Sequence, residues 1–105
     1  MEKRTIAGVE VGVNEEGYLT DRSQWTSDIA VEIAKELELP ELTEHHWKVI
    51  NFLREDYEEK ESVATLRRIR KTGGISTKDL YRLFPEGPIK KAAKVAGLPK
   101  PESCV

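Results

Sequence analysis

The stretch LFPEGPIKKAAKVAGLPKPESCV, residues 83–105, organises the rest of the chain. Proline and glycine stand on both sides of a short helical pattern over residues 89–96. Pro88 suits the first position of this helix because its ring holds φ near a helical value, and Gly97 suits the residue just after its end. The stretch therefore predicts one short helix with defined ends.

The residues after this helix form a different kind of segment. Pro99 and Pro101 forbid a continued helix and favour an extended polyproline conformation. Cys104, the only cysteine, is the last residue but one. We predict a single domain over residues 1–97 and a mobile arm over residues 98–105 that carries this thiol.

Two interpretations of Cys104 follow from the residues alone. The thiolate is the reactive form of cysteine, and the neighbouring carboxylates of Glu102 and of the C-terminus disfavour it. Such a thiol would react mainly when a partner's basic pocket surrounds it, which suits transfer of sulfane sulfur, as a persulfide, between proteins. The alternative is an incidental surface cysteine on a frayed terminus.

Composition limits the classes of protein to which the chain can belong. The 105 residues are 38% hydrophobic and 34% charged, as in one soluble globular domain with a modest core. No apolar run approaches the roughly 18 residues that a membrane span needs, and no secretory signal pattern stands at the N-terminus. We expect a cytoplasmic monomer with no membrane association.

No metal or cofactor site is predicted. A structural zinc needs about four Cys or His ligands, and the adjacent His45 and His46 point about 100° apart around a helix. We interpret these two as surface or partly packed histidines. No glycine-rich phosphate loop follows a strand.

Charge divides the chain into two halves. Residues 1–59 contain 6 Lys or Arg and 15 Asp or Glu, whereas residues 60–105 contain 11 and 4. The basic half indicates an acidic partner or substrate, although solvated helix faces of different charge would give the same pattern.

The element pattern predicts a mainly α (α+β) protein. β-Branched residues over 5–13, followed by the turn signal Asn-Glu-Glu-Gly, indicate an N-terminal β-hairpin. Apolar spacing then predicts helices, which with the last one form a small five-helix bundle. Their expected starts are Ser23 (running to about Leu39, with Trp25 in its first turn plugging the hairpin), Thr43, Ser62 (to Lys71) and Ser76.

The third and fourth helices, separated by Gly73-Gly74, have the outline of a helix-turn-helix. Basic residues decorate it, which raises DNA binding as an alternative function. The acidic chain as a whole, and the lack of Asn or Gln on the fourth helix, weigh against sequence-specific binding. Residues expected on this face are Arg67, Arg68, Arg70, Lys71, Lys78 and Arg82.

Residues 80–88 (LYRLFPEGP), 94–101 (KVAGLPKP) and Cys104-Val105 closely resemble the DsrC/TusE family of small sulfur-trafficking proteins. Weaker parallels are Glu16-Gly17-Tyr18-Leu19, Trp25, Thr43-Glu44-His45-His46-Trp47 and Arg67. The resemblance spans almost the whole chain. The fold that it implies, a β-hairpin on a helical bundle with a C-terminal arm, agrees with the element pattern.

The resemblance implies that Cys104 accepts sulfur as a persulfide and that the arm inserts into partners. The protein would be a sulfurtransferase-type carrier rather than a stand-alone catalyst. Its donor would be a TusBCD- or DsrEFH-like complex, and its acceptor a tRNA thiolase or dissimilatory sulfite reductase. An acidic partner face would bind the basic residues Lys90, Lys91, Lys94, Lys100, Arg67 and Arg82.

One departure from the family pattern bears on mechanism. DsrC proper has a second cysteine eleven positions before the penultimate one, and here that position is Ala93. An intramolecular disulfide is then impossible. Two further departures, Ala64 for a usual proline and Glu102-Ser103 before the cysteine, also favour a single-cysteine, TusE-like carrier over a sulfite reductase partner.

Overall fold

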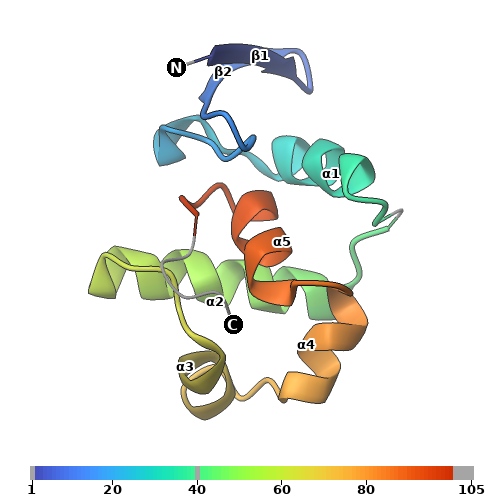
Figure 1. The fold of residues 1–105 in the computed structure, drawn as a ribbon, viewed down its shortest axis with the longest axis vertical. Coiled ribbons are helices and arrows are strands. Elements are labelled where there is room, and N and C mark those ends of the chain that lie inside the picture. Colours follow the sequence, from blue (N-terminus) through green and yellow to red (C-terminus); the bar gives the residue numbers. More distant parts are fainter. Residues whose placement is uncertain (1, 40, 101–105) are drawn as a thin grey trace.

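The computed structural model describes residues 2–39 and 41–100, which form a β-hairpin and five α-helices around one core (Figure 1). The mainly helical fold class predicted from the sequence is confirmed. The helix α5 is central, because it contacts α1 on one side and α2 and α4 on the other. In chain order the elements are β1 (Glu2–Ile6), β2 (Val9–Val13), a 3-10 turn (Arg22–Gln24), α1 (Ser27–Glu36), α2 (Glu44–Lys60), α3 (Leu66–Lys71), α4 (Thr77–Leu83) and α5 (Pro88–Val95).

The hairpin is present but is shifted along the chain relative to the prediction. β1 and β2 pair antiparallel, with Ile6 opposite Val9, and the two-residue turn is Ala7-Gly8. Both turn residues have positive φ, 53° and 78°, as the tight turns that match strand twist require. The sequence pattern missed this turn because alanine rarely adopts such a φ.

The turn predicted at residues 14–17 also forms. The Asn14 side chain accepts hydrogen bonds from the amides of Glu16 and Tyr18 (2.9 and 3.0 Å), and Gly17 has φ 89°. This turn leads only to an isolated bridge between Val13 and Leu19. It lies beyond the hairpin and reverses the chain toward the helices.

Two predicted helix starts are wrong. Asp21 accepts hydrogen bonds from the amide and hydroxyl of Ser23 in a separate 3-10 turn, so α1 begins later, with Thr26 as its N-cap, and ends at Glu36. Helix α3 likewise begins after Thr65, whose hydroxyl accepts from the Arg68 amide. Thr43, Ser76 and the first-turn Pro88 cap or begin their helices as predicted.

Arg68 does not decorate the surface as predicted. Its Nε donates to the carboxylate of Asp56 on α2 (2.9 Å), and its Nη2 donates to the Ser62 carbonyl (3.0 Å). Asp56 is only 6% exposed, so the ion pair is largely desolvated and each charge needs the other. The pair attaches the short helix α3 to α2.

His46 joins α2 to α4. Its Nδ1 accepts from the Thr43 amide (3.1 Å) and closes a reciprocal capping box at the start of α2. Its Nε2 then carries the proton donated to the Leu83 carbonyl (2.9 Å). The His46 ring also packs edge-on against buried Phe84, with centroids 5.2 Å apart. The interpretation of a partly packed histidine is therefore correct for this residue.

The hairpin turn yields a stability prediction. Ala7→Gly should raise the free energy of unfolding by about 0.5 kcal/mol, because glycine adopts the left-handed region without the steric cost of Cβ. Gly8→Ala, one residue later, should lower it by about 1 kcal/mol. Urea unfolding followed by circular dichroism measures both. Equal signs for the two substitutions would contradict the turn geometry.

Candidate functional site

The candidate site is the C-terminal end of α5, after which the predicted arm begins. Gly97, with φ 73°, donates its amide to the Lys94 carbonyl (3.2 Å), and Leu98 donates to the Ala93 carbonyl (2.9 Å). This pair of bonds is a Schellman ending, which the glycine made possible. Leu98 is 1% exposed and belongs to the core. We therefore propose that the arm begins after Leu98.

Side chains from two distant elements complete this helix end. The Trp25 indole donates Nε1–H to the Val95 carbonyl (2.8 Å), and Arg54 of α2 donates Nη1–H to the Ala96 carbonyl (2.8 Å). All four carbonyl groups that a helix leaves unpaired at its end are thereby satisfied here. Trp25 was expected in the first turn of a helix and against the hairpin. It precedes α1, and its indole lies on the end of α5.

Arg54 and Trp25 also contact each other. The Arg54 guanidinium carbon lies 4.0 Å from the centre of the Trp25 ring, within cation–π range. Burial, together with the positive charge of Arg22, lowers the pKa of Arg54 relative to its ordinary value. We call Trp25, Arg54 and Gly97 the arm clamp.

A second cluster flanks the first residues of the arm. Lys94 lies 4.9 Å from the centre of the Tyr18 ring, and Lys100 pairs with Glu16 at 2.9 Å. Burial raises the pKa of the Tyr18 phenol, the Glu16 carboxylate raises it further, and Lys100 partly opposes them. The turn at residues 14–17 thus lies beside the root of the arm, although the two are about 80 residues apart in sequence.

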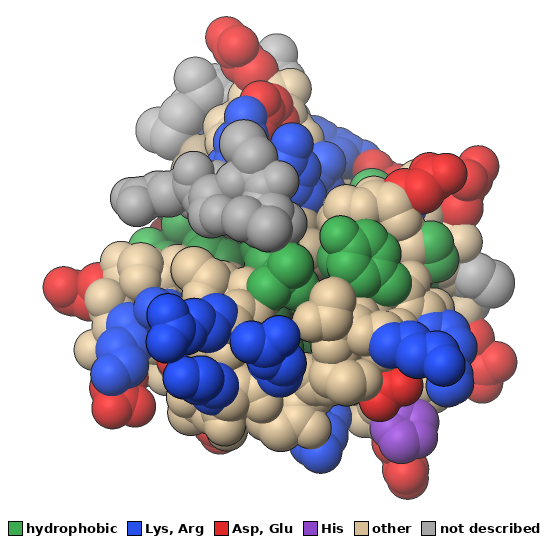
Figure 2. Space-filling model, turned by 60° about the horizontal axis from the view of Figure 1, so that its bottom comes forward, with side chains coloured by type: hydrophobic (Ala, Val, Ile, Leu, Met, Phe, Trp, Pro, Cys, Tyr) green, Lys and Arg blue, Asp and Glu red, His purple; other side chains and the backbone are tan. Residues whose placement is uncertain are grey.

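The basic residues predicted to bind partners fall into two groups. Lys90, which is exposed, and Lys91 and Lys94, which are half-buried, lie on the side of α5 that is not packed in the core, and Lys100 follows the helix. Arg67 on α3 and Arg82 on α4 are both exposed and belong to other elements. Figure 2 shows several Lys and Arg side chains gathered on the face that it views. Cys104 and Glu102-Ser103 lie outside the described residues.

Ala93 is fully buried within α5. The family resemblance drew attention to position 93, whereas nothing in the sequence pointed to Arg54. A single arginine on an amphipathic helix carries no signal of its partner, and only the neighbouring helix end explains it. Over the described ranges there is no group of three or more His, Cys, Asp or Glu suited to a metal ion. The same residues include no helix long and apolar enough to cross a bilayer.

The fold and the site define a class of protein: a small helical domain whose capped last helix is followed by a short segment of sequence that contains the one cysteine. The family model for the DsrC-like proteins matches residues 5–105. The chain therefore belongs to the DsrC family.

Individual relatives agree with this assignment. The chain is 42% identical to sulfurtransferase TusE of Photorhabdus laumondii, over 93% of this chain and 94% of that protein. Among solved structures, Allochromatium vinosum DsrC is 42% identical with a TM-score of 0.81, over 99% and 98% of the two chains. The DsrC/gamma subunit of dissimilatory sulfite reductase from Pyrobaculum aerophilum is 35% identical with a TM-score of 0.83, over 99% and 95%.

The arm clamp predicts that alanine at Gly97 lowers the free energy of unfolding much more than alanine at Gly74. A Cβ on Gly97 would clash with Cδ1, Cγ and Cβ of Trp25, whereas a Cβ on Gly74 would meet nothing within 4 Å; both glycines have positive φ. Gly97→Ala should cost about 3 kcal/mol of unfolding free energy, from backbone strain plus overpacking. Gly74→Ala should cost about 1 kcal/mol, from backbone strain alone.

Chemical unfolding of the two variants beside the unmodified chain gives the comparison. Near-ultraviolet circular dichroism of Trp25 and Trp47 reports whether the indole has moved. Equal losses of stability would mean that the clamp does not constrain Gly97.

Proposed function

We propose that this protein is a sulfur carrier that accepts sulfane sulfur on Cys104 and passes it between partner proteins. The observation that supports this most is the capped end of α5, which holds the root of the arm on a rigid domain. The relatives named sulfurtransferase TusE support the same function. The carrier has no stand-alone reaction, because both sulfur donor and acceptor are other proteins.

The transfer chemistry needs only thiolates and persulfides. The Cys104 thiolate attacks the terminal sulfur of a donor persulfide; the new S–S bond forms as the donor's S–S bond breaks, and the donor cysteine leaves as a thiolate. In the second transfer an acceptor nucleophile attacks the terminal sulfur on Cys104, which leaves as a thiolate. Each step exchanges one S–S bond for another bond to sulfur, so loading needs no external oxidant.

Ala93 restricts how the sulfur can leave. A second cysteine could attack the persulfide, expel the sulfur and close an intramolecular disulfide. The alanine at this position excludes that route, so the sulfur leaves only through a partner. This favours a TusE-like carrier, with a TusBCD- or DsrEFH-like donor and a tRNA thiolase as acceptor.

A second function within the family is that of a partner of dissimilatory sulfite reductase. The printed name of the Pyrobaculum aerophilum relative, a gamma subunit of that enzyme, favours it. DNA binding by α3 and α4 receives less support. The Arg68 guanidinium is paired with Asp56 and does not face a phosphate, and the Asp79 carboxylate on α4 would repel one. We place the carrier in the cytoplasm as a monomer.

Loading on Cys104 is tested by intact-mass analysis. After incubation with a polysulfide donor, the unmodified chain should gain the mass of one sulfur atom, about 32 Da, that dithiothreitol removes. Cys104→Ser should gain none. If the serine variant gains sulfur as readily as the unmodified chain, the proposed function is wrong.

The basic side of α5 gives a separate prediction about partner binding. Lys90→Glu with Lys91→Glu should slow sulfur transfer from a persulfide-loaded TusBCD-type complex by about 10-fold at low salt, because electrostatic steering is lost. At about 1 M salt, where charges are screened within about 3 Å, the difference should vanish.

Lys60→Glu with Lys71→Glu is the matched control, since it makes the same charge change on α2 and α3. Loading by a small polysulfide should be normal in both double variants. An equal slowing in the control would show that net charge, rather than this side of α5, matters.

A further inference from the structure

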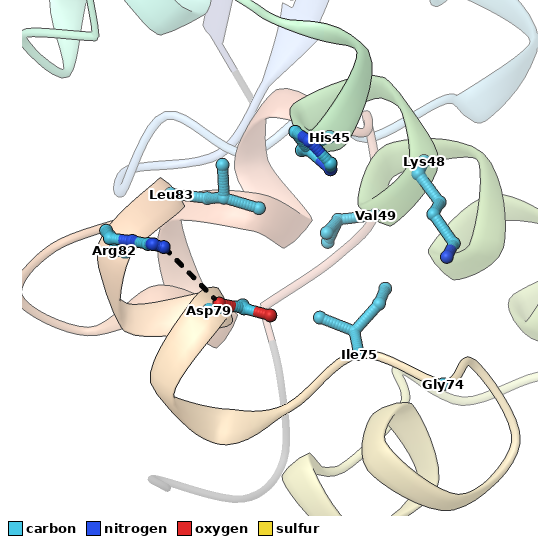
Figure 3. A pocket seen from close by; sticks show the side chains of 8 residues that line it. All are labelled: His45, Lys48, Val49, Gly74, Ile75, Asp79, Arg82 and Leu83. Atoms are coloured by element: carbon cyan, nitrogen blue, oxygen red, sulfur yellow. Dashed lines mark ion pairs between the residues drawn. The ribbon is translucent and has the colours of Figure 1, made fainter.

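The described part of the chain contains a second feature suited to binding, separate from the arm. A pocket of about 540 Å³ lies between the start of α2, the turn before α4, and α4 itself (Figure 3). This volume is within the range of roughly 300–1,000 Å³ typical of ligand sites. The residues that line it are His45, Lys48, Val49, Gly74, Ile75, Asp79, Arg82 and Leu83.

The pocket has an apolar floor and a rim of net positive charge, on which Lys48 and Arg82 outnumber the carboxylate of Asp79. Val49 and Ile75 are buried core residues whose side chains reach the pocket, and Leu83 is half-buried beside them. The exposed side chains of Lys48 and Arg82 come from different helices and stand on either side in Figure 3. An occupant therefore combines an apolar group with a negative charge.

The walls of the pocket are preorganised. His46, next to His45 in the first turn of α2, donates to the backbone carbonyl of Leu83 on the opposite wall (2.9 Å). The Ser76 hydroxyl accepts from the Asp79 amide and fixes the start of α4. Asp79 pairs with Arg82, one turn further along α4, at 3.7 Å. Little conformational entropy is then lost on binding.

The charge pattern discriminates between classes of partner. A nucleic acid presents phosphates at regular spacing, and the Asp79 carboxylate on the rim would repel one of them. A peptide can offer single carboxylates to Lys48 and Arg82 while its backbone N–H groups donate to Asp79. A peptide also supplies an apolar side chain for the floor, as helix and strand anchors do in protein interfaces.

We propose that this pocket docks a partner's peptide segment in which an apolar side chain is flanked by Asp or Glu. The inference rests on the proposed function, because a carrier must hold its partner while the thiol of the arm reacts. The site is distinct from the arm clamp: Lys48 and Arg54 are six residues, or about 9 Å, apart along α2. A partner would thus bind the domain at two places, one of them independent of Cys104.

The test uses the full chain and a random dodecapeptide library displayed on phage. We expect enrichment of peptides with Leu, Ile, Phe or Trp next to Asp or Glu. A synthetic copy of an enriched peptide should shift the amide resonances of Gly74 and Ile75 in the ¹⁵N-labelled chain. Lys48→Glu with Arg82→Gln should weaken its binding by about 10-fold, since each rim charge contributes up to about 1 kcal/mol.

The control variant, Lys60→Glu with Lys71→Gln, makes the same charge change away from the pocket and should bind within about twofold of the unmodified chain. The proposal is overturned if no acidic-apolar peptide is enriched, or if the pocket and control variants bind equally. It is also overturned if a 12-nucleotide single-stranded RNA binds the pocket in place of peptides. Polysulfide loading of Cys104 in the same variants reports separately on the carrier function.

Discussion

The rest of the structure depends on one constraint: the last carbonyl groups of α5 have no hydrogen-bond partner within the helix and need donors from elsewhere. A helix that ends inside a protein must find donors for its last carbonyls, or lose roughly 1–3 kcal/mol for each buried group. Here the donors are the amides of Gly97 and Leu98, the Trp25 indole and the Arg54 guanidinium. The segment before α1, the middle of α2 and the end of α5 are thereby joined at one point.

In the proposed function, the helical domain fixes the end of α5, and the segment after it delivers the thiol. Three helices contact α5 and fix its position, and its buried alanines allow close packing against them. In that proposed function, a short segment that follows such a base would keep its thiol within a limited volume, so the effective concentration of the thiol at a docked partner would be high. The persulfide exchange that we propose suits this division, because the chemistry would belong to the thiol and the partner would supply the environment that activates it.

The helix starts show where local sequence was sufficient and where it was not. Thr43, Ser76 and Pro88 were predicted correctly because each acts on amides or backbone angles within its own first turn. Ser23 and Ser62 were equally plausible starts, but the N-caps of these two helices are Thr26 and Thr65. Which residue begins each helix depends on which start directs the apolar stripe to the core. The Ala7-Gly8 turn was missed because strand pairing imposes a φ that alanine does not favour.

The sequence by itself determined the class of fold, the helical ending at Gly97, the single thiol near the C-terminus and the absence of a second cysteine at Ala93. These properties depend on residue type and on neighbours a few positions away. Only the tertiary structure decided that Trp25 and Arg54 cap α5, that Glu16 meets Lys100, and that Lys48 and Arg82 share one pocket. Each of these pairs is 34 or more residues apart along the chain, so the packing of helices, and no local propensity, brings them together.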